Sequence, residues 1–331
     1  MSRHGLTRAR TMGPIAAAVT LAGGSLTRVF AQAEVPLALL DTPDRLILLR
    51  DQLRLVEAAI RETGDPTLPA RLSMETGLTG LGAIGLQVRT TASLKEALER
   101  VEVVTPHLLQ TATWTGLRYR EATAFYGYAV TEPITIGRQA NEILALGYLL
   151  GTARHFLGAA WRPERAVVTG ASLRRRAEIE HLFGCEIALG PRAGLVFPAA
   201  CIDAANPSRY EPAGHAAAAA PIEDDVVACV AHLIDLALDE TRPSIDWIAG
   251  RLGLSRRTLQ RRLDEAGTRY ADIQRRVLLR RAEDSLARND AAIGRIALDL
   301  GYADAAHFTR AFLTWTGVTP SQWRRSRPPK T

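Results

Sequence analysis

The chain has 331 residues, which is a length typical of two domains, and 47% of them are hydrophobic, enough to form buried cores. Its formal net charge of +6 is unevenly distributed, because residues 241–331 carry 18 Arg and Lys against 9 Asp and Glu, whereas residues 1–240 carry 23 against 26. No apolar run reaches the ~18 residues of a membrane-spanning helix, so we expect no membrane partner and a polyanion partner only for the carboxyl-terminal region.

The amino terminus superficially resembles a secretory signal. Arginines precede an apolar run at residues 15–22, and residues 31–33 imitate a signal-peptidase site. However, Arg28 lies between the run and the imitated site, and Gly23-Gly24 interrupts the run. We therefore interpret the run as the first helix of an amino-terminal domain over residues 13–205.

This domain alternates helices with short strands. Periodic apolar residues and capping signals, among them Ser93 with Glu96, predict helices over 46–63, 94–101, 138–157 and 173–183. Segments rich in Thr, Tyr, Trp and Phe predict a hairpin of strands 111–119 and 122–130. Further short strands are predicted over 165–169, 186–189 and 194–197. The mixture predicts an α+β domain.

A candidate small-molecule site combines aromatic and charged residues of this domain. Trp114, Tyr126 and Tyr128 lie on the predicted hairpin, and Glu142 and Arg154 interrupt an otherwise apolar helix. A binding pocket needs apolar walls with a few convergent polar groups. The alternative interpretation is that the aromatic residues are sheet core and the charges lie at the surface.

A segment of low complexity separates the two regions. Residues 206–221 are rich in Pro, Gly and Ala, which is typical of a linker. Residues 222–240 then have the apolar spacing of a helix, which would begin a second domain over 222–327.

The second domain contains one short pattern twice. Ala249 is followed four residues later by Gly253, and Ala297 by Gly301, at an offset of 48 residues. A small residue lets two helices cross closely, and glycine adopts the positive φ of a tight turn at little cost. The repeat predicts two tandem helix-turn-helix motifs, near 244–266 and 292–316, in an all-α domain.

The second helix of each motif has its own signals. Ser255 is a suitable N-cap for a helix whose Leu259 and Leu263 share one face. In the second motif Phe308 and Phe312 take the same positions. A helix without Pro or Gly is predicted over 270–288 between the motifs. At ~1.5 Å per residue its length is roughly 28 Å, close to the ~34 Å between major-groove segments one turn apart.

Residues 221–327 resemble the DNA-binding domain of AraC/XylS-type transcription regulators. The resemblance rests on Ile248-Ala249-x3-Gly253-Leu254-Ser255, on Ile296-Ala297-x3-Gly301-Tyr302 and on residues 308–324. In the last segment Thr319 and Gln322 also predict a capping box, with Pro320 at the first helical position. It implies that the partner is double-stranded DNA. The implied DNA-contacting positions are Arg256, Arg257, Gln260 and Arg261 in the first motif and Ala305, Ala306, His307, Thr309 and Arg310 in the second.

The amino-terminal region resembles the arabinose-binding-like sensor domain of one branch of that family. The matching landmarks are residues 93–98, Trp161-Arg162-Pro163, Phe183-Gly184-Cys185 and Val196-Phe197-Pro198. The resemblance implies a cytoplasmic activator that binds a small-molecule effector, contacts RNA polymerase and forms a possible homodimer. The alternative is a constitutive DNA-binding regulator whose amino-terminal domain only dimerises.

Catalytic signatures are missing from the sequence. It has no Gly-x-Ser-x-Gly element, no phosphate-binding Gly-rich loop and no His/Cys cluster at metal-ligand spacing. The three cysteines, Cys185, Cys201 and Cys229, fit reduced, small hydrophobic residues better than a metal site. We therefore expect no enzyme activity, no catalytic residues, no cofactor and no metal.

Overall fold

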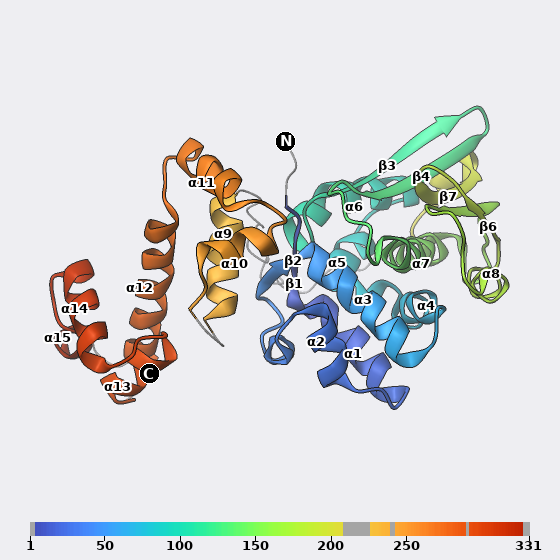
Figure 1. The fold of residues 1–331 in the computed structure, drawn as a ribbon. Helices are drawn as coiled ribbons and strands as arrows, with labels where there is room; N and C mark the ends of the chain where they lie inside the picture. Colours follow the sequence, from blue (N-terminus) through green and yellow to red (C-terminus); the bar gives the residue numbers. More distant parts are fainter. Residues whose placement is uncertain (1–3, 208–225, 239–241, 289–290, 327–331) are drawn as a thin grey trace. The chain divides into compact units, whose positions relative to one another are not determined.

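The computed structural model describes residues 4–207, 226–238, 242–288 and 291–326. The chain forms two compact units, Met1–Asp224 and Asp225–Thr331 (Figure 1). The first unit mixes helices with a mixed sheet, and the described part of the second is built of helices. The predicted combination of an α+β unit and an all-α unit is confirmed.

The first unit begins with a short two-stranded sheet. β1 (Leu6–Arg8) pairs antiparallel with β2 (Leu46–Leu48). The helices of this region are α1 (Met12–Leu21), α2 (Leu26–Ala33) and α3 (Leu49–Thr63). The apolar run at 15–22 therefore lies in a helix of the folded unit. The prediction of a helix from Leu46 was wrong for its first three residues, because pairing with the distant β1 overrides the local helical pattern.

Besides α2, helices α4 (Leu68–Gly80) and α5 (Ala83–Arg89) had no counterpart in the sequence prediction. Glycines lower helix propensity by about 1 kcal/mol each relative to alanine, and this stretch holds Gly77, Gly80, Gly82 and Gly85. Gly77 kinks α4, with φ of 50°. Packing of α4 against α7 (Arg138–Leu157) compensates for the weak propensity.

The central sheet has five strands in the order β3-β4-β7-β5-β6. The strands are β3 (Thr113–Arg120), β4 (Thr123–Val130), β5 (Arg165–Val168), β6 (Glu186–Leu189) and β7 (Ala193–Pro198). β3 and β4 form the predicted hairpin, with Thr115 opposite Tyr128. β5 and β6 are the parallel pair, and helix α8 (Arg176–Phe183) connects them. α8 begins three residues later than predicted.

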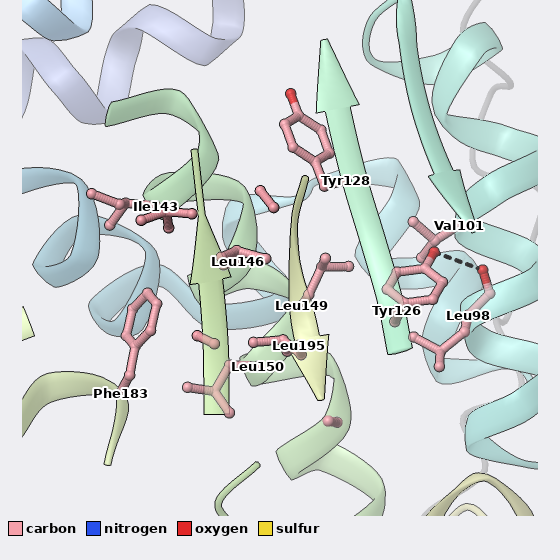
Figure 2. Packing of buried hydrophobic residues seen from close by; sticks show 14 of the residues in the cluster. Leu98, Val101, Tyr126, Tyr128, Ile143, Leu146, Leu149, Leu150, Phe183 and Leu195 are labelled. Carbon is pink, nitrogen blue, oxygen red and sulfur yellow. Dashed lines mark hydrogen bonds between the residues drawn. The ribbon is translucent and has the colours of Figure 1, made fainter. Parts of the chain in front are cut away.

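Helices α6 (Leu94–Leu108) and α7 pack against the sheet (Figure 1). Ser93 caps α6 as predicted, but the Glu96 carboxylate accepts from the N–H of Ala92, at 2.8 Å, instead of completing a capping box on Ser93. Where α7 crosses α4, a Cβ at Gly147 would lie 1.9 Å from Ser73 Oγ, so this crossing requires glycine. Figure 2 shows the resulting core, in which residues of α7 such as Leu146 and Leu150 meet Leu195 of β7.

The described part of the second unit contains seven helices. They are α9 (Val226–Ala237), α10 (Ile245–Arg251), α11 (Arg256–Glu265), α12 (Tyr270–Arg288), α13 (Ile293–Asp299), α14 (Ala305–Thr316) and α15 (Pro320–Arg325). The predicted helix over 270–288 is confirmed. Helix α12 contacts α9, which itself packs on the first helix pair, α10 and α11. It also contacts α13 and α15, so it connects the first pair with the second pair, α13 and α14.

The turn and capping predictions for this unit are also confirmed. Gly253 and Gly301 have φ of 66° and 74°. The Ser255 hydroxyl accepts from the N–H of Thr258, and Thr319 forms the predicted capping box with Gln322. Local side-chain chemistry therefore sets where these helices begin.

Residues 208–221 of the predicted linker lie outside the described residues, as do residues 222–225 and 239–240 of the helix predicted over 222–240. Among the described residues, no helix combines the length and the apolar character needed to cross a membrane.

Candidate functional site

Helix α11 presents a basic, polar face. Leu259 and Leu263 are buried at 0% and 1% exposure and fix the helix against its neighbours. Six side chains on the remaining faces are exposed: the basic and amide groups of Arg256, Arg257, Gln260 and Arg261, and, in the last turn, the carboxylates of Asp264 and Glu265. All four side chains that the family resemblance implied for this helix are therefore accessible together.

The four side chains differ in their partners. Arg256 Nη1 lies 3.2 Å from Asp246 Oδ2, and Arg261 Nε lies 3.6 Å from Glu265 Oε1. The side chains of Arg257 and Gln260 form no hydrogen bond or ion pair with any other described residue. Since these two groups do not have to leave a protein partner, they can bind an external one at the lowest cost.

Helix α14 presents a different face in the second motif. Its Phe308 and Phe312 are fully buried, whereas Ala306, His307 and Arg310 are exposed and Ala305 and Thr309 are half-buried. The two alanines can offer a base only a methyl contact.

His307 is held by the N-cap of its own helix. Asp304 Oδ1 accepts from the His307 backbone N–H at 2.7 Å, and Oδ2 lies 2.9 Å from the His307 ring Nδ1. The backbone hydrogen bond, with help from the ring, holds the pKa of Asp304 below its ordinary value of 3.8. Arg310, Thr309 and the second ring nitrogen of His307 are therefore the hydrogen-bonding groups left for DNA on this face.

The first unit contains a cavity of about 320 Å³. Its walls are mostly aliphatic, with side chains from α4, α5, α6 and α7 such as Leu72, Leu81, Ile84, Val101, Leu144 and Leu149. Polar groups also line it, among them Gln52 of α3, Gln110, Asn141 of α7 and Tyr128 of β4. Apolar walls with a few convergent polar groups are typical of small-molecule sites.

Tyr128 is the centre of the polar cluster. Its hydroxyl accepts from Gln110 Nε2 at 3.0 Å and from Asn141 Nδ2 at 2.7 Å. Burial raises the pKa of Tyr128 to about 12, so its hydroxyl keeps its proton at neutral pH. Gln52 is 4% exposed, and its Oε1 has no hydrogen-bond partner among the described residues.

The five residues of the sequence-based candidate site do not converge. Tyr128 alone of the five lines the cavity. Figure 2 shows the Tyr126 hydroxyl directed away from that of Tyr128, and it donates to the Leu98 carbonyl at 3.0 Å. Trp114 lies on the opposite face of the sheet, where its ring covers Gly116 and Gly127.

The two charged members of that candidate site have structural partners. The Glu142 carboxylate accepts from both the N–H and the hydroxyl of Thr169, and burial raises its pKa. The Arg154 guanidinium donates to the carbonyls of Trp161 and Phe183, and burial lowers its pKa. Each connects α7 to a neighbouring loop and lies outside the cavity lining.

Sequence reasoning missed Gln52, Gln110 and Asn141. A local signal existed for both amides, since Gln52 takes an inward position of the amphipathic helix α3 and Asn141 interrupts the almost continuously apolar helix α7. Gln110 follows the end of α6 and reaches Tyr128 only through the tertiary fold.

Two family models match the chain. Residues 23–206 match the arabinose-binding domain of AraC transcription regulator, N-terminal, and residues 248–326 match a helix-turn-helix domain. The first match alone covers more than half of the chain.

Similar proteins include several regulators. The chain is 28% identical over 308 residues to the HTH-type transcriptional regulator VirS of Mycobacterium tuberculosis, covering 88% of each chain. It is 27% identical over 324 residues to the ornithine utilization regulator of Pseudomonas aeruginosa, covering 92% of each. Among solved structures, the transcriptional regulator CdpR from Pseudomonas aeruginosa matches with 20% identity and a TM-score of 0.37, over 78% of this chain and 87% of that one.

Proposed function

The chain belongs to the AraC family of transcription regulators, and from this premise we propose that it is a sequence-specific activator controlled by a small metabolite. The observation that supports the DNA-reading role most directly is the pair Arg257 and Gln260, both exposed and without a partner among the described residues, on a helix fixed by Leu259 and Leu263.

We assign the two motifs unequal roles on DNA. Arginine can donate two hydrogen bonds to guanine, and glutamine can pair with adenine, so Arg257, Gln260 and Arg261 would read bases in one major-groove segment. Helix α14 would enter the neighbouring segment, with Thr309 and Arg310 contacting phosphate or bases and Ala305 and Ala306 contacting methyl groups. Arg256 and His307 flank these groups and would contact the backbone.

The effector would occupy the cavity around Tyr128. The matching family model is named for arabinose and one relative for ornithine, so these names point to different compounds. The cavity volume and its mixture of apolar walls and buried polar groups support a small-molecule ligand. Binding would favour one arrangement of the regulator and thereby change its contact with RNA polymerase.

Homodimerisation, the polymerase contact and a cytoplasmic location are parts of the same proposal. In the second candidate function the first unit serves only to dimerise, and DNA binding is constitutive. The buried, unpartnered Gln52 Oε1 in the cavity favours the effector-binding alternative, because buried acceptors are normally paired.

Selection of binding sites from random duplex DNA by the full-length protein tests the DNA-reading role. We expect one enriched sequence containing two elements about one helical turn apart. That sequence, placed upstream of a core promoter, should raise transcription by RNA polymerase in vitro. Failure to enrich a sequence at moderate salt would contradict the proposal, and lower transcription would make the protein a repressor.

A further inference from the structure

The walls of the cavity do not suit a ligand rich in hydroxyl groups. Three of the four threonines that line it use their hydroxyls within their own chain segment: Thr11 donates to the Arg8 carbonyl, Thr79 to that of Thr76, and Thr105 to that of Val101. The two other lining hydroxyls outside the Tyr128 cluster are those of Thr115, which is buried without a partner among the described residues, and of Tyr148, which accepts from Thr76. Most other lining side chains are aliphatic. A sugar would therefore leave several hydroxyls without partners, and unpaired buried polar groups are unfavourable.

The cavity lining carries positive charge but no negative charge among the described residues. Of the described residues that line the cavity, Arg10 alone is charged, and none is acidic. Its Nη2 pairs with Asp44, and its Nη1 lies 3.9 Å from the position that a Cβ would take at Gly82. The Arg10 guanidinium thus reaches toward the α4–α5 turn at a partly exposed edge of the cavity. This charge attracts an anionic group and repels a cationic one.

The polar cluster adds a donor and an acceptor. A phenolic oxygen accepts at most two hydrogen bonds, and the amides of Gln110 and Asn141 already supply both to Tyr128. The proton of the Tyr128 hydroxyl is therefore left to a ligand acceptor. Gln52 Oε1, buried and without a partner among the described residues, offers an acceptor to a ligand N–H or O–H.

From these features, and resting on the proposed effector role of the cavity, we propose that the ligand is a compact, mainly apolar carboxylic acid with one additional N–H or O–H donor. Its acid group would accept from Tyr128 or Arg10, and its donor would meet Gln52.

Two matched sets of probes test this ligand class on the full-length protein. The first set shares an indole body: indole-3-acetate, tryptophol, tryptamine and 1-methylindole-3-acetate, which lacks the N–H. The second shares an aliphatic body: octanoate, octanol and octylamine. We expect thermal stabilisation to decrease from acid to alcohol to amine within a set, and indole-3-acetate to exceed its methylated analogue. L-arabinose should have no effect.

Variants locate the binding. Ala145→Phe fills the cavity and should abolish stabilisation by the acids. Tyr128→Phe should weaken acid binding about ten-fold or more, whereas Tyr119→Phe, at an exposed position of the same hairpin, should not. Arg10→Gln should weaken binding of the acids about two- to five-fold without affecting the alcohols. Arg54→Gln removes another surface ion pair, with Glu34, and serves as its control.

The ligand class is overturned if neither acid stabilises the protein, if an amine or L-arabinose binds more tightly than the acids, or if binding survives Ala145→Phe. DNA binding is measured on the same samples. If one of these outcomes occurs while sequence-specific DNA binding is intact, only the ligand class is refuted. If the unmodified protein shows no sequence-specific DNA binding, the proposed function itself is refuted.

Discussion

The two helix pairs α10–α11 and α13–α14 share a frame and differ in what they expose. Both place an alanine at the crossing and a positive-φ glycine in the turn, and both bury two large side chains four residues apart. On α11 the exposed face holds arginines and glutamine, while on α14 it begins with two alanines and a histidine held by Asp304. The buried residues thus give both helix pairs the same fold, and the exposed residues make their surfaces chemically different.

The difference suggests a division of labour between the two motifs. Groups that can form bidentate bonds to bases lie mainly on α11, so most sequence discrimination should come from that helix. Substitutions at corresponding positions of the two motifs test this difference.

Truncation of the buried anchors compares the two frames. Phe308 packs against Tyr302 and Phe312, with ring centroids 5.5 and 5.7 Å away. Phe308→Ala should lower the free energy of unfolding by about 3–5 kcal/mol, and Leu259→Ala by about 2–5 kcal/mol. The loss should be smaller for Leu259→Ala, because removal of a leucine side chain leaves a smaller cavity than removal of a phenylalanine side chain. Urea denaturation measures both, with Leu313→Ala as an exposed control. A larger loss for Leu259→Ala would show that the first pair depends more on its anchor.

Truncation of the exposed groups compares the two DNA faces. Arg257→Ala with Gln260→Ala should weaken binding to the selected sequence by about 1–3 kcal/mol per lost base contact and relax its specificity. Thr309→Ala with Arg310→Ala should weaken binding more evenly across sequences. Fluorescence anisotropy on specific and scrambled duplexes measures both, and Arg100→Ala in the first unit is the control. Equal loss of specificity in the two variants would refute the division of labour.

Substitution of the turn glycines tests the shared frame. Gly253→Ala and Gly301→Ala should each lower stability by about 1–2 kcal/mol because of the left-handed backbone. Gly301→Ala should have the larger effect, since its Cβ would lie 3.2 Å from that of Arg242. Gly294→Ala, in helix α13 with no atom within 4 Å of the added Cβ, should instead be neutral or stabilising. Calorimetric unfolding would expose any departure from this order.

The helix caps differ in their dependence on pH. The folded state lowers the pKa of Asp304 below 3.8, so its contribution to stability is present above that value and is lost as the pH falls through the lowered pKa. The stability difference between the unmodified protein and Asp304→Ala should therefore shrink in acid. Ser255→Ala removes a cap that does not titrate, and its effect should stay constant. If the stability difference for Asp304→Ala stays constant with pH, the negative charge of Asp304 does not contribute to this cap.

The sequence predicted those elements whose signals are local. Helices 138–157 and 270–288 have the bounds expected from their apolar period and flanking residues. Helices α4 and α5 escaped prediction because their glycines oppose helix formation and tertiary packing stabilises them, on the distant α7 for α4 and on the following helix α6 for α5. Strands β1 and β2 were also not predicted, because they pair with each other across about forty residues and neither has a local signal.

The two candidate sites show the same contrast. The exposed face of α11 follows from helical spacing within ten residues, so sequence and family resemblance were enough to list its members. The cavity collects Gln52, Gln110, Tyr128 and Asn141 from separate parts of the first unit. Sequence reasoning reached only Tyr128, because no spacing rule relates positions that meet only through the tertiary fold.

Hydroxyl-radical footprinting of the full-length protein on its selected duplex tests the central claim most directly. We expect protection of two segments on one face of the DNA, about one helical turn apart, with the segment read by α11 lost in the Arg257→Ala, Gln260→Ala variant. A single protected segment, or a pattern unchanged in that variant, would contradict the unequal two-helix reading of DNA.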